Sequence, residues 1–142
     1  MRYLLAFVAG FASTLLFHQG LLFLLHRAGV SPRPAYAMTP TWPLGVPQVV
    51  SLAFWGGLWA MALVPLLTRW QGSWRELLAW AVAGAIGPTL VALLVVMPLK
   101  GGRVAGGGDP KLIAGALLLN GAWGFGTALL LRGLEALLRR VG

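Results

Sequence analysis

Four long apolar stretches occupy most of this chain, and they constrain its fold more than any other feature. They run over residues 3–25, 47–67, 76–99 and 112–131. Each holds about 20 residues or more, which is the length that a helix needs to cross the ~30 Å hydrocarbon core of a bilayer. Because lipid offers the backbone no hydrogen-bonding partner, each stretch is predicted to be a membrane-spanning helix.

The composition also favours a chain that lies almost wholly in or near a membrane. Of the 142 residues, 58% are hydrophobic and only 10% are charged, whereas a typical soluble domain has about 25% charged residues. No polar stretch is long enough for a separate soluble domain. We therefore expect a single integral membrane domain over residues 1–142, with an all-α fold in which four transmembrane helices form a bundle.

The net charge of +8 does not point to nucleic acid, because the basic residues are spread over the ends of the apolar stretches. They are Arg2, Arg27, Arg33, Arg69, Arg75, Lys100, Arg103, Lys111, Arg132, Arg139 and Arg140. This distribution is typical of long side chains that reach toward lipid headgroups. The expected partner of these residues is therefore a bilayer with anionic headgroups, and no nucleic-acid partner is expected.

Residues that carry catalysis or bind metals are scarce. The chain has no cysteine, which excludes disulfides, thiolate metal sites and cysteine nucleophiles. Its carboxylates, Glu76, Asp109 and Glu135, lie at the ends of apolar stretches, and no metalloprotease or serine-hydrolase motif is present. His18 and His26 lie on one predicted helix and cannot bind one haem from both faces. We expect no enzymatic activity, no cofactor and no metal site.

The sequence between the stretches contains several helix-start signals. Ser73 and Glu76 have the spacing of a capping box at the start of the third stretch, and Asp109 followed by Pro110 is typical of a helix start at the fourth. The first stretch is longer than the 7–15 residues of a signal-peptide core, so it is expected to remain as a span. The proline-rich connector 30–46 is expected to lie against the headgroups, either as a plain joining loop or as a lid.

Four spans place both ends of the chain on the same side of the membrane. With the termini inside, Arg2, Arg69, Arg75, Arg132, Arg139 and Arg140 are cytoplasmic, and the other basic residues lie outside. The positive-inside rule therefore gives only a small preference. We predict cytoplasmic termini, because the short loop after residue 67 and the C-terminal tail concentrate arginine on that side.

The two halves of the chain share short sequence segments. Gly10 follows an Ala in the first stretch as Gly84 does in the third, and Trp55-Gly56 in the second stretch is matched by Trp123-Gly124 in the fourth. Repetition of this kind is typical of membrane folds built from duplicated units. One origin that this pattern indicates for the bundle is a duplicated helical hairpin, with its two copies in parallel topology.

Small residues recur at helical spacing along all four stretches. Such stripes let the backbones of two helices approach closely, which is how helices associate in lipid. The pattern predicts helix-packing positions within one chain or between subunits. These positions are Gly10, Gly56, Gly57, Ala83, Gly87 and Gly124.

Few polar residues lie inside the apolar stretches, and several of them fall at a similar depth. At ~1.5 Å of rise per residue, four of them lie about 10–15 Å from the same end of the bundle. We predict that His18, Gln19 and Asn120 form a hydrogen-bonded cluster, with Trp55 or Thr89 as a neighbour. Such a cluster can hold helices together, or it can serve as a proton relay or polar substrate site; a haem ligand at His18 is a further alternative.

Two classes of function follow from these patterns. The first is an interaction, scaffold or accessory protein that assembles with itself or with a larger membrane complex through its small-residue helix faces. The second is a small oligomeric transporter or channel with a polar layer at His18, Gln19 and Asn120 along its path. Many proton-coupled transporters have an acidic residue inside the membrane. In this chain the four stretches contain only Glu76, at the very end of one stretch, which argues against a proton-coupled pump.

Several sequence segments resemble those of a group of small bacterial inner-membrane proteins that have four spans and no assigned activity. They are Phe17-His18-Gln19-Gly20, Pro43-Leu44-Gly45-Val46-Pro47-Gln48, Ser51-Leu52-Ala53-Phe54-Trp55-Gly56-Gly57 and Asn120-Gly121-Ala122-Trp123-Gly124. The resemblance covers most of the chain. It implies a four-span membrane protein of bacteria and transfers no catalytic residue.

Overall fold

The computed structural model describes residues 1–141 and is all-α, apart from one very short hairpin. The first long helix comprises α1 (Arg2–Ser13), the π-helical turn η1 (Thr14–His18) and α2 (Gln19–Arg27). The second comprises α3 (Gln48–Leu67) and η2 (Thr68–Trp70). The third comprises α4 (Trp74–Val91), the π-helical turn η3 (Ala92–Val96) and α5 (Met97–Leu99). After a short turn, η4 (Val104–Gly107), the fourth is α6 (Pro110–Val141).

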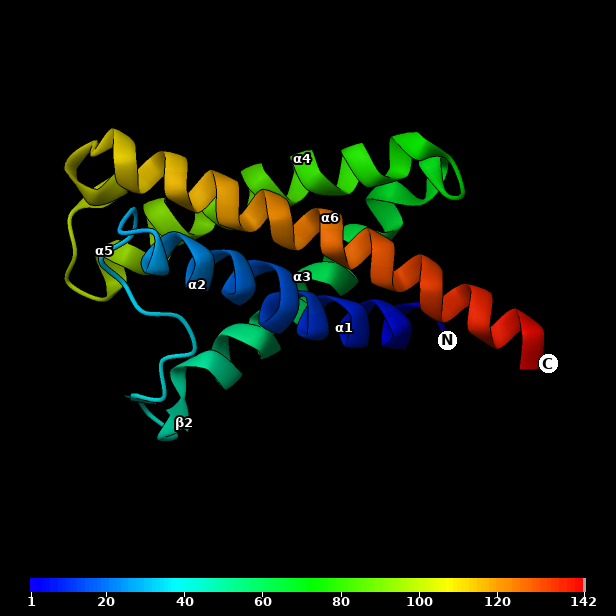
Figure 1. Ribbon diagram of the computed structural model, residues 1–142, viewed down its shortest axis with the longest axis horizontal. Helices are drawn as coiled ribbons and strands as arrows, with labels where there is room; N and C mark the ends of the chain where they lie inside the picture. Colours follow the sequence, from blue (N-terminus) through cyan, green and yellow to red (C-terminus); the bar gives the residue numbers. More distant parts are fainter. Residues whose placement is uncertain (142) are drawn as a thin grey trace.

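These four helical segments are each long and apolar enough to cross a membrane. They lie side by side along the long axis of the molecule, with both chain ends at one end and the connector at the other (Figure 1). The end that carries the termini is called the terminal end below. At the start of α6, the carboxylate of Asp109 accepts a hydrogen bond from the Lys111 N–H at 2.9 Å, so the predicted cap is present.

The fourth helix does not stop near residue 131, where its apolar stretch ends. It continues to Val141 and extends past the other helices at the terminal end (Figure 1). The C-terminal tail is therefore a continuation of α6. Its Leu, Ala, Arg and Glu residues all favour helix, and Arg132 and Glu135 form ion pairs with other helices that fix this part of α6 in place.

Two pairs of helices are held together by close contact between glycines. A Cβ atom placed on Gly10 of α1 would lie 2.5 Å from the Gly56 carbonyl oxygen of α3. A Cβ atom placed on Gly84 of α4 would lie 2.9 Å from the Gly124 Cα of α6. Only glycine permits such an approach of backbone to backbone. These four glycines are also the ones that the short shared segments of the two halves of the sequence contain.

Trp123 of α6 joins the two pairs at the centre of the molecule. Its indole N–H donates to the Gly10 carbonyl of α1 at 3.0 Å, and its own carbonyl accepts from the Ser13 hydroxyl at 2.6 Å. Trp123 is 3% exposed and Ser13 is fully buried. Both polar groups of a large aromatic residue are thereby satisfied away from water, and α1 is fixed against α6 as well as against α3.

The connector between α2 and α3 has a defined structure. Pro40–Thr41 and Val46–Pro47 form the strands β1 and β2 of an antiparallel hairpin, so α3 begins at Gln48, one residue after the expected start. The Thr41 hydroxyl donates to the Val46 carbonyl at 2.8 Å. The hairpin projects to the side of the helices, next to the start of α3 (Figure 1).

Substituting Gly84 with alanine is expected to destabilise the protein by about 1–3 kcal/mol, the usual cost of overpacking. The new methyl group would lie 2.8 Å from the Asn120 carbonyl oxygen, so α4 and α6 would have to separate. The matched control is Gly115→Ala on α6, where a Cβ atom meets nothing within 4 Å and alanine favours the helix. Thermal unfolding in detergent, followed by circular dichroism, measures both. Equal losses in the two variants would contradict the close contact.

Candidate functional site

Gln19, one of the predicted cluster residues, anchors the connector to the first helix. It is 4% exposed. Its amide nitrogen lies 3.2 Å from Nδ1 of His18, and its amide oxygen accepts the Tyr36 backbone N–H at 2.7 Å. The Tyr36 hydroxyl in turn donates to the Leu15 carbonyl at 2.9 Å. Tyr36 has a φ of 56°, an uncommon value outside glycine, and these two hydrogen bonds hold it there.

Asn120 and Thr89 form a second polar pair, between α6 and α4. The Asn120 amide donates to the Thr89 hydroxyl at 2.8 Å, and that hydroxyl lies 3.3 Å from the Ala116 carbonyl oxygen as a donor. Thr89 is 2% exposed. The pair lies along the same α4–α6 contact as Gly84 and Gly124. Its bonds join two helices, which is the behaviour of inter-helix polar contacts in lipid.

The predicted single cluster is thus divided into two pairs. His18 and Gln19 bond to each other, and Gln19 also bonds to the connector, whereas Asn120 bonds to Thr89; no hydrogen bond in the described part of the chain joins the two pairs. Trp55 belongs to neither, since its side chain is 57% exposed and its ring packs edge-on against Phe54. Similar depth did not bring these residues together, because Gln19 faces the connector whereas Asn120 faces α4.

The predicted helix-packing residues have two locations. Gly10, Gly56, Gly57 and Gly124 lie in contacts within this chain, where an added Cβ atom would meet backbone or aromatic atoms closer than ordinary contact distance. A Cβ atom placed on Gly87 would lie 3.4 Å from the Trp59 ring, an ordinary contact, and Ala83 lines a surface groove between α3 and α4. Four of the six positions therefore stabilise the folded chain itself.

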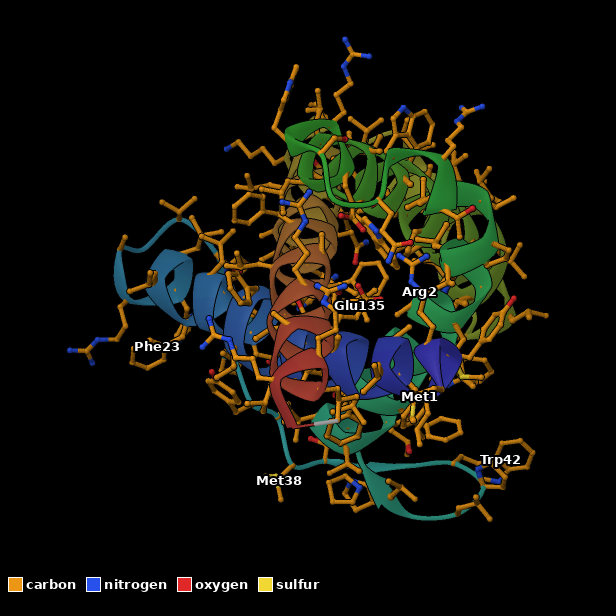
Figure 2. All side chains as sticks on the ribbon, turned by 90° about the vertical axis from the view of Figure 1, so that its right-hand side faces the viewer. Met1, Arg2, Phe23, Met38, Trp42 and Glu135 are labelled. Atoms are coloured by element: carbon orange, nitrogen blue, oxygen red, sulfur yellow. The ribbon has the colours of Figure 1, made fainter. Side chains whose placement is uncertain are left out.

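An ion-pair network at the terminal end is the most strongly charged feature of the interior, and the sequence patterns did not predict it. The Glu76 carboxylate, on α4, is 1% exposed and accepts from Nε of Arg132 at 2.8 Å, with Arg2 at 3.5 Å. Arg2 also binds Glu135 at 2.8 Å. Gln71 completes the network with a 3.1 Å hydrogen bond to Glu135. Figure 2 shows Arg2 and Glu135 close together between the helices.

This network replaces the capping box expected at the start of α4. The Ser73 hydroxyl donates to the Trp70 carbonyl at 2.7 Å and does not cap the helix. The Glu76 carboxylate accepts the Gly72 N–H at 3.0 Å, and Arg132 also donates to the Ser73 carbonyl. A buried carboxylate needs charged partners, and residues from both ends of the chain supply them. That partnership has no local sequence signal.

No family model, curated protein or solved structure matches this chain. The assignment of a function therefore depends on its own geometry. Within residues 1–141, no group of three or more histidine or carboxylate side chains is placed to hold a metal ion. The polar groups described above bond to one another or to backbone atoms of the same chain, and such bonds fix helices and the connector in place.

Replacing Glu76 with glutamine is expected to destabilise the protein by about 3 kcal/mol, because it removes the buried carboxylate that pairs with Arg132 and leaves Arg2 with Glu135 alone. Glu135→Gln is the matched control. Its carboxylate is 12% exposed and binds one arginine, so its loss is expected to cost less. Chemical or thermal unfolding of both variants in the same detergent gives the order. A larger effect at Glu135 would contradict the central position of Glu76.

Replacing Gln19 with leucine is expected to release the connector while the helices stay folded. The Tyr36 N–H loses its acceptor, and loss of one hydrogen bond of about 1 kcal/mol corresponds to roughly fivefold faster opening. Hydrogen–deuterium exchange of connector peptides measures this. Asn120→Leu, which removes the other polar pair, should leave exchange in the connector unchanged. Equal acceleration by both variants would show general loosening instead.

Proposed function

We propose that this protein is a bundle of four transmembrane helices in a bacterial inner membrane, with both termini cytoplasmic. The four apolar helices, the side-by-side packing and the arginines of the terminal end support this placement. The matching contacts Gly10–Gly56 and Gly84–Gly124 further support an origin by duplication of a helical hairpin.

Within that membrane, the proposed function is that of a non-enzymatic interaction or accessory protein, assembling with itself or with a larger complex. The observation that carries this proposal is the fixed connector. Buried Gln19 holds Tyr36, and the hairpin then presents Trp42 and Leu44, which are 94% and 84% exposed. Figure 2 shows Trp42 at the outer edge of the molecule, away from the helices. Exposed aromatic and aliphatic side chains on a fixed support are typical of partner contacts.

The small-residue faces give less support to this assembly than the sequence suggested. Gly10, Gly56, Gly57 and Gly124 are already used within the chain. The contact surface in the proposal is therefore the connector hairpin on the outer side of the membrane. A bilayer interface is the competing environment for Trp42, because tryptophan also favours headgroup regions.

The alternative function is a small oligomeric transporter or channel with His18, Gln19 and Asn120 along its path. The intramembrane position of these polar groups favours it, because such groups often mark a pathway. Their bonding argues for the interaction protein, since Gln19 and Asn120 each have a partner in the same chain. Flux through reconstituted vesicles, compared between the native protein and His18→Leu with Asn120→Ala, separates the two functions.

The double variant Trp42→Ala, Leu44→Ala is expected to lose its partner while keeping its own fold. The measurement is purification in mild detergent from native membranes, with the mass of the complex compared with that of the 15.1 kDa chain. Leu16→Ala, Leu24→Ala is the matched control, since both leucines are 63% exposed on the helix surface. A partner lost equally from both double variants, or retained by both, would contradict the proposed surface.

A further inference from the structure

A groove on the outer surface of the molecule separates α3 from α4 at the terminal end. It has a volume of about 520 Å³, and its walls are apolar except for one arginine. The residues used below are Leu67, Trp70, Trp74, Arg75, Ala79 and Ala83. The groove exists because α3 packs on α1 and α4 packs on α6 through their glycines, so the two consecutive helices diverge from their shared loop.

The dimensions of the groove match one leaflet of a bilayer. It follows α4 from Trp74 to Ala83, which is about 14 Å at ~1.5 Å per residue. That is close to half of a ~30 Å hydrocarbon core. At greater depth, Trp59 of α3 reaches Gly87 of α4 and fills the space between the helices. The groove therefore runs from the interface to about the midplane and stops there. The groove is open along this length because the side chains of Ala79 and Ala83 are small.

Two arginines lie at the loop end of the groove: Arg75 is in its wall, and Arg69 lies over the ring of the wall residue Trp70. The Arg69 guanidinium lies 3.8 Å from the centre of the Trp70 ring, and Arg75 lies 5.9 Å from that of Trp74. Both arginines are exposed. The ion pairs of residues 1–141 involve only Arg2 and Arg132 as cations, so the two carboxylates at this end are already occupied.

From this combination we infer that the α3–α4 groove is a binding site for an anionic phospholipid. One acyl chain lies along Ala79 and Ala83, and the phosphate lies between Arg69 and Arg75 with the two indole rings at headgroup level. Arginine stacked on an aromatic ring is well placed to bind phosphate, and basic pockets between transmembrane helices hold anionic headgroups. The inference rests on the proposed membrane location and is independent of the connector hairpin as a partner surface.

The test uses the purified full-length chain in mild detergent, titrated with dioleoylphosphatidylglycerol or dioleoylphosphatidylcholine and examined by native mass spectrometry. The phosphatidylglycerol adduct is expected to form about tenfold more readily, as befits two arginines near an anionic group. Arg69→Gln, Arg75→Gln should abolish this preference. Arg103→Gln, Lys111→Gln removes the same charge from exposed positions at the opposite end and should retain it.

A second pair of variants tests the acyl-chain part of the site. Ala83→Leu fills the groove and should reduce retention of both lipids, whereas Ala114→Leu, at an exposed position on α6, should not. Equal binding of the two lipids by the native chain, or equal loss with both charge variants, would overturn the inference. So would a dimer that Ala83→Leu converts to a monomer, since a second copy would then occupy the groove. The Trp42→Ala, Leu44→Ala variant should keep its preference for phosphatidylglycerol even when it has lost the hairpin partner. The lipid site and the proposed function can therefore fail separately.

Discussion

The close approach of two pairs of helices at glycine is the constraint on which the rest of the structure depends. Without side chains at Gly10, Gly56, Gly84 and Gly124, backbone meets backbone, and dispersion acts over the whole contact. The Trp123 indole donates to the Gly10 carbonyl at 3.0 Å beside this contact. A Cβ atom on Gly56 would lie 3.1 Å from the indole nitrogen, so glycine at this position also leaves room for the central hydrogen bond.

The sequence predicted the elements of this fold better than their arrangement. Hydropathy and length gave four helices, and Asp109 gave the start of the fourth. Glycine spacing indicated where helices touch, since four of the six expected positions lie in tight contacts. It did not indicate which helix each one touches. That choice depends on shape across the whole molecule, and no local pattern carries it.

The interior polar groups show where depth alone fails as a guide. His18 and Asn120 were expected at similar distances from the same end of the bundle. In the structure His18 bonds to Gln19 and Asn120 bonds to Thr89. Glu76 likewise has partners that its position in the sequence did not indicate. Its sequence spacing favours a local cap, but a fully buried carboxylate is stabilised more by arginine than by a backbone N–H alone. Arg132 and Arg2 become available only after the chain has folded.

One side of the molecule is closed and the other is open because α1 and α4 pack differently on their neighbours. Helix α1 lies against both α3 and α6, and Trp123 fills the junction. Helix α4, in contrast, packs closely on α6 and reaches α3 through Trp59 and Gly87. Because Ala79 and Ala83 are too small to bridge to Leu67, a groove remains there. In lipid an apolar groove of this kind is filled by whatever fits its length and charge.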